Sequence, residues 1–385
     1  QAEDGIRDVE RSRGLGDVYK RQEGELGMTS ETINIGLIGA GGNTKLRHIP
    51  GFLAQDNVHI SGVCNRSIES GQRVADEYGI EKVYGSWTDL VEDPDIDAIC
   101  IGTWPYMHCT MVIAALEYGK HVMTEARMAV DASEAHAMLD ASRQFPEQIT
   151  QIVPAPHTLN LDKTIVKLIK EGYVGDVLSV DAAISQGGFV DHEKLFHWRQ
   201  SRDFSGFNIM GLGIWYEAIM RWVGSASSVQ ALTRTTVKRR NDEDGNPHVV
   251  SVPDHVEILC EMFSGPTLHI RFSDVLGHAP ANAVYIFGTE GTLKIDGSDQ
   301  TAPKLWGGQK SDSGLSEIEI VAELQGDWRV EEEFINAIRG KEDITHTNFQ
   351  DGVRYMEFTE AVTRSCLLYT SPSPRDLSTS RMPSS

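Results

Sequence analysis

The feature that most constrains this fold is a glycine bend that joins an apolar strand to a helix near the start of the chain. The run "INIGLIGA" (33–40) is an apolar strand, and the sequence "GLIGAGGNTKLRH" continues into a segment that can form a helix over 44–53. Gly39 and Gly41 fit the first two positions of G-x-G-x-x-G, Gly42 adds freedom, and Thr44 takes the third position. Such a bend brings backbone N–H groups and a helix N-terminus to a pyrophosphate. The sequence therefore predicts a dinucleotide site, with a glycine turn that binds nothing as the alternative.

Strands and helices alternate regularly after the bend. Further apolar strands are expected at 58–64, 97–103, 120–125 and 148–156, each separated from the next by a helical pattern. This alternation predicts a doubly wound parallel sheet in a Rossmann domain over 30–152, and hence an α/β fold.

The pattern changes in 153–365, which is predicted to form a second α/β domain. One helix (162–172) precedes β-rich stretches that are linked by turn signals, which favours a mostly antiparallel sheet. The polar insert 238–248 is expected to be an exposed loop. The β-rich stretches are 177–185, 228–238, 255–265, 267–275 and 283–296.

Composition excludes several classes of function. A chain of 385 residues suggests two domains, and a formal charge of −21 argues against nucleic acid or anionic lipid as a partner. No apolar run reaches the roughly 20 residues of a membrane span. The five cysteines lack CxxC spacing, so a reduced, cytoplasmic setting is expected. No metal site is expected either, because His192 and His197 in "DHEKLFH" lie five residues apart and do not share a helical face.

Both ends of the chain look foreign to the fold. Residues 1–22 and 366–385 show no sustained helix or strand period, and each resembles translated adapter or linker sequence. We expect both segments to be non-native tails, with a native start near Met28. A pair of native disordered tails is the alternative.

The end of the second strand bears on the choice of cofactor. Folds that prefer NAD usually place Asp or Glu there to hold the ribose 2′-hydroxyl, whereas this chain has Asn65, Arg66 and Ser67. No carboxylate repels a 2′-phosphate, and Arg66 and Ser67 could hold one. NADP is therefore favoured over NAD.

Several segments together resemble the Gfo/Idh/MocA oxidoreductase family over nearly all of 31–365. They are "GLIGAGG", "GTWPYMH", "ALEYGKHVMTEARMA", "EGYVGDV" and "IFGTEGTLKID". The resemblance implies an N-terminal Rossmann domain and a C-terminal α/β domain with a large open sheet. It also implies a homodimer or homotetramer that oxidises or reduces sugars or polyols with NAD or NADP. By the same resemblance, the residues lining the nicotinamide side are Thr103, Trp104, Pro105 and His108.

The sequence departs from the family pattern at two expected proton-transfer positions. The family turn Glu-Lys-Pro appears here as Glu125-Ala126-Arg127, and Arg127 is a poor base because it holds its proton. In the pattern Asp-x-Gly-x-His-x-x-Asp, the three polar positions are taken by Gly211, Trp215 and Ala218. The chemistry is therefore relocated, or the protein binds a dinucleotide without turnover.

Residues near these positions are candidates for the missing roles. Histidine titrates near neutrality, so His157 and His197 are candidate proton carriers. Glu125 is expected to orient Arg127 or to touch the nicotinamide ribose. The full candidate set is Glu125, Arg127, His157, His197 and Tyr216 for catalysis, and Trp198, Arg199, Trp215 and Glu217 for substrate binding. Each has a plainer alternative, such as helix capping for His157 or helix packing for Trp215 and Tyr216.

The sequence thus predicts an NAD(P)-dependent oxidoreductase that transfers a hydride between nicotinamide and a secondary alcohol or ketone of a sugar or polyol. A non-catalytic dinucleotide or sugar sensor on the same fold is the main alternative. A third possibility is an enzyme that keeps its nicotinamide bound and eliminates or hydrolyses through a transient ketone.

Overall fold

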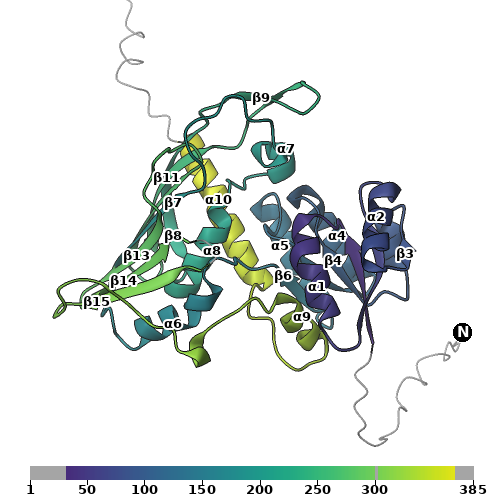
Figure 1. Cartoon of the computed structure of the whole chain (residues 1–385), viewed down its shortest axis with the longest axis horizontal. Coiled ribbons are helices and arrows are strands. Elements are labelled where there is room, and N and C mark those ends of the chain that lie inside the picture. The colour runs from purple at the N-terminus through teal and green to yellow at the C-terminus, as the bar shows by residue number, and fades with distance from the viewer. Residues whose placement is uncertain (1–31, 300–301, 369–385) are drawn as a thin grey trace, which may run out of the picture.

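The computed structural model describes residues 32–299 and 302–368, which form two α/β halves side by side (Figure 1). The first predicted tail, 1–22, lies outside the described residues. The second, 366–385, overlaps them only where the long helix α10 (Phe349–Leu368) continues to its end.

The first half is built on a parallel six-stranded sheet in the order β3-β2-β1-β4-β5-β6. Its strands are β1 (Ile33–Ile38), β2 (Val58–Cys64), β3 (Lys82–Val83), β4 (Ala98–Ile101), β5 (His121–Thr124) and β6 (Thr150–Ile152). The chain reverses its direction of winding between β1 and β4, which is the point where doubly wound sheets bind ligands. The helices are α1 (Ile49–Leu53), α2 (Ile68–Tyr78), α3 (Trp87–Glu92), α4 (Pro105–Glu117) and α5 (Ala132–Gln144). The predicted Rossmann sheet is confirmed.

The second half carries an eight-stranded sheet in the order β16-β15-β14-β13-β7-β12-β11-β8. All of its neighbouring strands run antiparallel except β7 and β12. The predicted large, mostly antiparallel sheet is therefore confirmed. Its strands are β7 (Val177–Ser185), β8 (Ala226–Arg234), β11 (His255–Met262), β12 (Thr267–Ser273), β13 (Asn282–Gly288), β14 (Gly291–Gly297), β15 (Lys304–Gln309) and β16 (Ser316–Glu317).

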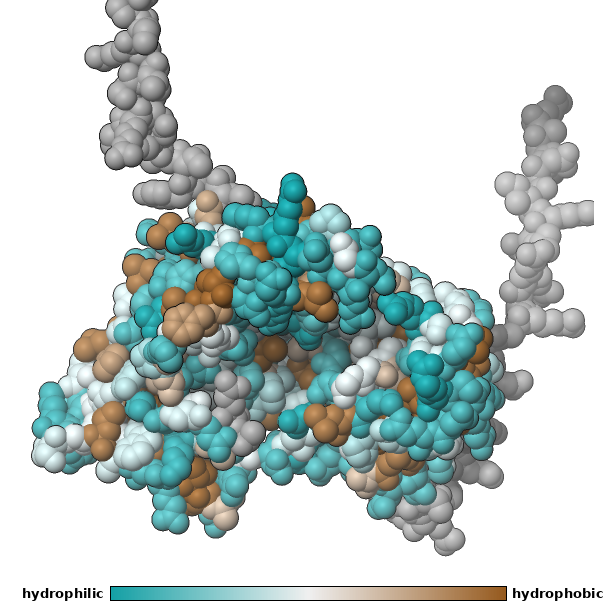
Figure 2. Space-filling view, turned by 45° about the horizontal axis from the view of Figure 1, so that its top comes forward, coloured by the Kyte–Doolittle hydropathy of each residue, from teal (hydrophilic) through white to brown (hydrophobic). Residues whose placement is uncertain are grey.

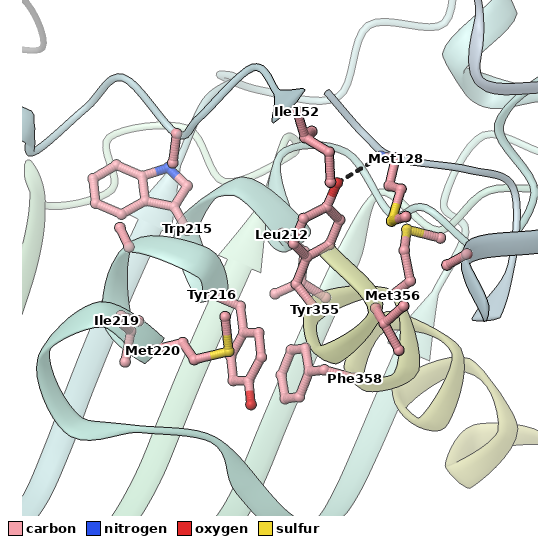
Figure 3. Close-up of a cluster of buried hydrophobic side chains, with 14 of the residues drawn as sticks. Met128, Ile152, Leu212, Trp215, Tyr216, Ile219, Met220, Tyr355, Met356 and Phe358 are labelled. Carbon is pink, nitrogen blue, oxygen red and sulfur yellow. Dashed lines mark hydrogen bonds between the residues drawn. The ribbon is translucent and has the colours of Figure 1, made fainter. Parts of the chain in front are cut away.

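Helices cover the face of this sheet that looks toward the first half (Figure 1). They are α6 (Leu159–Lys170), α8 (Leu212–Val223) and α10, and a short helix, α7 (Arg202–Ser205), precedes α8. Ten of the twelve residues of α8 are buried, because it lies between the sheet, α6 and α10. Figure 3 shows apolar side chains of α8 and α10 packed together beside Met128 from the first half. One hydrophobic core therefore runs across the junction and fixes how the two halves face each other.

Helix α9 (Val330–Ile338) lies inside the segment predicted for the second domain, yet it packs on the first. Phe334 meets Phe52 of α1 edge to face at 6.4 Å between ring centroids. Both residues are completely buried, in a cluster that also contains residues of β1 and β2. The C-terminal part of the chain thus returns to the Rossmann sheet and brings Glu331 with it.

The insert 238–248 forms a β-hairpin, so the predicted loop was wrong. Its strands are β9 (Arg239–Asn241) and β10 (Pro247–Val249). Arg240 is buried and donates hydrogen bonds to the carbonyl oxygens of Asp191 and Lys194 at 2.8 and 2.7 Å. The hairpin therefore supports the loop 191–197, whose backbone carbonyls supply the partners that a buried guanidinium needs.

Among the helices of the described residues, none combines the length and the apolar character that crossing a bilayer requires.

Candidate active site

A cleft of about 1130 Å³ lies between the two halves. The space-filling view in Figure 2 shows the surface hollowed between them. One wall comes from loops that follow β1, β4 and β5, and the other from residues 194–200 and 210–214 of the second half. The carboxyl ends of the parallel strands therefore open into the cleft, as expected for a ligand site in a doubly wound sheet.

The glycine bend forms the floor of this cleft beside β1. Gly39 has φ +84, and a Cβ there would lie 2.9 Å from the backbone nitrogen of Thr103, so the fold itself requires glycine. At Gly42, which lines the cleft, a Cβ would meet nothing within 4 Å. Open space beside an exposed backbone is what a pyrophosphate needs at this position, so the bend fits a dinucleotide.

Thr44 stands where the glycine pattern would have a third small residue. It is buried, and its Oγ1 lies 3.3 Å from the carbonyl oxygen of Gly39. A Cβ at Gly102 would lie 2.3 Å from Oγ1 of Thr44, so the Thr44 hydroxyl fills the space between β1 and β4. The helix expected over 44–53 consists of a π-helical turn (Thr44–His48) followed by α1.

The three residues at the end of β2 have different duties. Asn65 accepts a hydrogen bond from the backbone N–H of Ala40 at 2.8 Å and donates one to the carbonyl of Ser70 at 3.1 Å. Ser67 caps α2 by accepting from the backbone N–H of Ser70. Arg66 is exposed and forms no ion pair with the described residues. Only Arg66 has a side chain that is wholly available to a ligand.

The segment 103–108 contributes an aromatic side chain, Trp104, to the cleft wall and a buried histidine, His108, that links two loops. Trp104 stacks on Trp198 across the cleft, with 5.0 Å between ring centroids and 14° between planes. Pro105 starts α4, and both Thr103 and Pro105 line the cleft. The expectation that His108 lines the nicotinamide side was wrong. Its ring is completely buried, within 3.0 Å of the carbonyl oxygens of Thr103 and Arg127, and it ties the two loops together.

Glu125 is held by a network that crosses to helix α9. Its Oε1 lies 2.9 Å from Nε2 of His48, whose Nδ1 lies 2.5 Å from Glu331, and Asn43 donates a hydrogen bond to the same Oε1. Trp328 donates to the other oxygen of Glu331 at 2.9 Å. Contact with Arg127 was one expected role of Glu125, but the carboxylate pairs with His48 instead.

Two carboxylates control the charge of His48, which is completely buried. Burial alone lowers its pKa, but the hydrogen bonds and charges of Glu125 and Glu331 outweigh this and raise the pKa to about 9. Burial would raise the pKa of Glu125, yet its bond to His48 brings the pKa below its usual value. The pair is therefore ionised at neutral pH, and Glu125 is a weak base.

Arg127 extends from the turn after β5 toward α8. Its side chain is only 4% exposed, and its Cδ lies 3.5 Å from the place where a Cβ of Gly213 would be. The residue lines the cleft, and its Nε has no hydrogen-bond partner among the described residues. The peptide bond between Ala126 and Arg127 is cis.

His157 lies flat against Trp215, the residue at the position where the family pattern has histidine. Their ring centroids are 4.9 Å apart, with 13° between planes. His157 is half-buried in the cleft wall and forms no hydrogen bond with the described residues. Burial and the nearby charge of Arg221 lower its pKa, so the ring is neutral at neutral pH.

Tyr216 and Glu217 do not face the cleft, so both expected roles were wrong. Tyr216 is 1% exposed and stacks on Phe358 with 3.6 Å between ring centroids (Figure 3). Its hydroxyl oxygen accepts a hydrogen bond from the backbone N–H of Ala226 at 2.8 Å. Glu217 is buried, where it accepts from Ala155 at 2.8 Å and pairs with Arg221 at 3.0 Å. Both residues belong to the packing of α8.

Trp215 touches the cleft only through His157. It is 5% exposed, it is not among the residues that line the cleft, and its indole nitrogen has no partner among the described residues. Direct contact with substrate is therefore excluded for this ring in the structure.

The loop 194–200 supplies the opposite wall. Arg199 places its guanidinium over the ring of Trp198 at 4.2 Å from the ring centroid. His197 caps the short turn Trp198–Gln200 by accepting a hydrogen bond from the backbone N–H of Arg199 at 3.2 Å. One nitrogen of His197 is therefore occupied, while Trp198 and Arg199 are open to the cleft.

No group of three or more His, Cys, Asp or Glu side chains is placed to hold a metal ion within 32–299 and 302–368.

Sequence reasoning missed His48, Glu331 and Trp328. His48 and Glu331 are 283 residues apart, and each looks like an ordinary helix residue in its own segment. Only the return of α9 to the Rossmann sheet brings them together.

Comparison with known proteins agrees with this architecture. Residues 33–150 match the model of the oxidoreductase family with an NAD-binding Rossmann fold, and residues 163–294 match the GFO/IDH/MocA C-terminal domain. The chain is 25% identical over 270 residues to a trans-1,2-dihydrobenzene-1,2-diol dehydrogenase of Bos taurus, which covers 68% of this chain and 72% of that protein. It is 26% identical over 288 residues to a levoglucosan dehydrogenase of Pseudarthrobacter phenanthrenivorans, with 68% and 73% covered.

Solved structures share the fold. A levoglucosan dehydrogenase in complex with NADH and L-sorbose has a TM-score of 0.75 and 22% identity, and covers 87% of this chain and 97% of that chain. At this identity the likeness establishes the fold alone.

Proposed function

The chain belongs to the Gfo/Idh/MocA family of oxidoreductases, and from this we propose that it interconverts a secondary alcohol and a ketone on a sugar, a polyol or a derivative, with NAD or NADP. The observation that carries the proposal is the position of His157. It is a neutral histidine in the cleft wall, beside the place where the family pattern has its own histidine, and it has no competing partner among the described residues.

The residues that would hold the cofactor lie along the carboxyl edge of the first sheet. The backbone at Gly41 and Gly42 would receive the pyrophosphate, and the loop 103–105 the nicotinamide side. Arg66 supports a preference for NADP, because it is exposed and no carboxylate pairs with it among the described residues. When bound, the nicotinamide ring supplies the acceptor or donor of the hydride.

We assign the role of proton acceptor and donor to His157. In alcohol oxidation, a ring nitrogen of His157 takes the proton of the reacting hydroxyl, and in ketone reduction it returns that proton. Trp215 holds the ring in a fixed plane, which makes Trp215 a positioning residue. Glu125 stays ionised beside His48 and fixes the wall of the cleft instead of exchanging protons.

The substrate would lie between the two halves. Trp198 and Trp104 form a stacked pair at the cleft, which provides an apolar face for the carbon skeleton of a sugar and excludes water. Arg199 beside them can donate to hydroxyl or carboxyl oxygens. The relatives named above that act on sugars or diols support this class of substrate.

We further propose that two copies pair through the outer face of the eight-stranded sheet. Leu232 of β8 and Leu259 of β11 are 72% and 53% exposed there, on neighbouring strands. Such a patch favours burial against a second copy. The five cysteines are all free, which fits the reducing cytoplasm that we propose as the location.

A non-catalytic sensor is the second candidate, because Ala126 and Trp215 occupy positions that carry proton-transfer residues in the family pattern. The two functions are separated by incubating the full chain with NAD+ or NADP+ and a panel of sugars, polyols and sugar acids. Formation of reduced nicotinamide, measured by its near-ultraviolet absorbance, supports the dehydrogenase. Saturable cofactor binding without turnover of any compound supports the sensor.

A further inference from the structure

Arg127 is a buried cation without a counter-charge. Its side chain is 4% exposed, and none of its guanidinium nitrogens forms a hydrogen bond or an ion pair with another described residue. Because removing a charge from water is costly, a buried guanidinium is normally paired with a carboxylate. Arg127 lines the cleft, so the cleft is where the missing partner can bind.

Arg199 is a second unpaired cation in the same cleft. It contacts the face of Trp198 and forms no ion pair with the residues that the structure describes. Burial first, and then the charge of Arg199, lower the pKa of Arg127 to about 10. Both side chains line the same cleft, so an anion bound between them would offset the repulsion of their like charges.

The amino end of helix α8 adds a third source of positive potential. Its N-cap residue, Gly211, provides no capping side chain, and the first turn contains no acidic residue. Gly211 and Ile214 line the cleft, and the stem of Arg127 lies against Gly213. The uncapped amino end of a twelve-residue helix attracts negative charge, because its backbone N–H groups have no partners within the helix.

No acidic residue of the described cleft wall forms an ion pair with Arg127 or Arg199, although the charge of Glu125 acts on Arg199 and opposes the lowering of the Arg199 pKa by burial. Glu125 is paired with His48, and Asp254 accepts hydrogen bonds from Thr236. Asp274 interacts with Lys194, and its own pKa is raised by burial. Glu243 is exposed on the turn of the β-hairpin.

We propose that the substrate carries an anionic group, a carboxylate or a phosphate, which binds between Arg127 and Arg199 at the amino end of α8. The substrate is then a sugar acid, a polyol acid or a sugar phosphate. This inference rests on the proposed oxidoreductase function for the identity of the reacting group, but not for anion binding itself. A neutral polyol would leave both guanidinium groups without an ion-pair partner among the described residues.

The test is calorimetric titration of the full chain with matched pairs of compounds, with and without saturating cofactor. D-glucuronate and D-glucose form one pair, D-galacturonate and D-galactose a second, and glycerophosphate and glycerol a third. The carboxylate and phosphate arms separate the two sources of anion. The variants are Arg127→Met and Arg199→Met, and the control is Arg143→Met, which removes an exposed cation on α5 that does not line the cleft.

We expect at least one anionic compound to bind at least about tenfold more tightly than its neutral match. Arg127→Met and Arg199→Met should each lower the affinity for the anionic compound about tenfold or more, while Arg143→Met leaves it unchanged. If Arg127→Met does not fold, Arg199→Met decides the question, because this side chain is exposed. Neutral compounds that bind as well as the anions, or anion binding that neither variant weakens, would overturn the inference.

The same titrations keep the two proposals apart. Cofactor binding and turnover of neutral polyols, with no preference for anions, would leave the oxidoreductase function intact and sink the anion site. Anion binding that depends on Arg127, without cofactor binding or turnover, would support the anion site and contradict the oxidoreductase function.

Discussion

The imidazole ring of His157 lies parallel to the indole ring of Trp215, with 4.9 Å between their centroids and 13° between their planes. The two residues come from different segments, the loop after β6 and helix α8, and they meet at the cleft between the two halves. Stacking fixes the plane of a ring that has no hydrogen bond to the described residues. A histidine from elsewhere in the chain thus lies beside the position to which the family pattern gives a histidine.

Replacing His157 should remove the proton carrier without removing the cofactor site. We expect His157→Asn to lower kcat by about a hundredfold or more, with unchanged affinity for NAD(P). The wild-type rate of alcohol oxidation should fall as pH drops through the pKa of His157, which lies below its ordinary value, and the variant should lack this limb. The control is His136→Asn, an exposed histidine paired with Glu357. Unchanged kcat and an unchanged acidic limb in His157→Asn would show that another group carries the proton.

The ion pairs of His48 should make stability fall in mildly alkaline solution. The folded-state pKa of about 9 lies above the unfolded value near 6.5, so the contribution is complete below about pH 6.5 and is lost as pH rises toward about 9. The shift corresponds to about 3 kcal/mol of unfolding free energy. Urea unfolding at several pH values measures it. His48→Gln should be less stable at pH 6 and should lose most of this slope, and an equal slope in both proteins would contradict the assignment.

Two glycines of the bend should separate folding from cofactor binding. Gly42→Ala should melt at the wild-type temperature, because a Cβ there meets no atom within 4 Å, yet it should weaken NAD(P) binding at least about tenfold. Gly39→Ala should instead destabilise the fold by about 1–3 kcal/mol, because φ is +84 and Thr103 is too close. Thermal melts and cofactor titrations of both variants test this. Wild-type cofactor affinity in Gly42→Ala would place the pyrophosphate elsewhere.

The ion-pair network of Glu217 should matter for stability and not for substrate contact. Arg221 forms ion pairs with Glu217 at 3.0 Å and with Asp162 at 2.9 Å, and all three side chains are largely buried. Because breaking a buried network leaves a charge uncompensated, Glu217→Ala should cost about 3 kcal/mol in denaturant unfolding. Glu261→Ala, an exposed glutamate on β11, is the control. Normal stability with lost substrate binding in Glu217→Ala would restore the role that the sequence suggested.

Sequence predicted the elements that depend on local pattern. The bend at Gly39, the alternation of the first half and the antiparallel strands of the second were all readable from residue periods and turn signals. Helix α8 was not readable in the same way. Nearly every position in α8 is apolar, so the spacing of apolar residues does not show which face of the helix lines the cleft. It could not predict that Tyr216 and Glu217 are buried in the core.

The site was predictable only in part, because its partners are far apart in the chain. Arg127 was found from a departure within a local motif, and His197, Trp198 and Arg199 from their place ahead of the second altered motif. The structure brings all four to the cleft. The pairing of His48 with Glu331 depends on α9 returning to the first sheet, and no local signal announces that return. The motif around His108 suggested a cofactor residue. In the structure its ring is buried, with backbone carbonyl oxygens of distant residues as its hydrogen-bond partners, and the motif does not show this.

Energy transfer from tryptophan to bound NADH or NADPH tests the central claim most directly, namely that the glycine bend holds a nicotinamide dinucleotide with its ring in the cleft. Trp104 and Trp198 lie in that cleft, so excitation of tryptophan should produce saturable emission from the reduced nicotinamide. The signal should shrink in Trp104→Phe and weaken with Gly42→Ala. Absence of saturable emission and of tryptophan quenching with either cofactor would contradict the account.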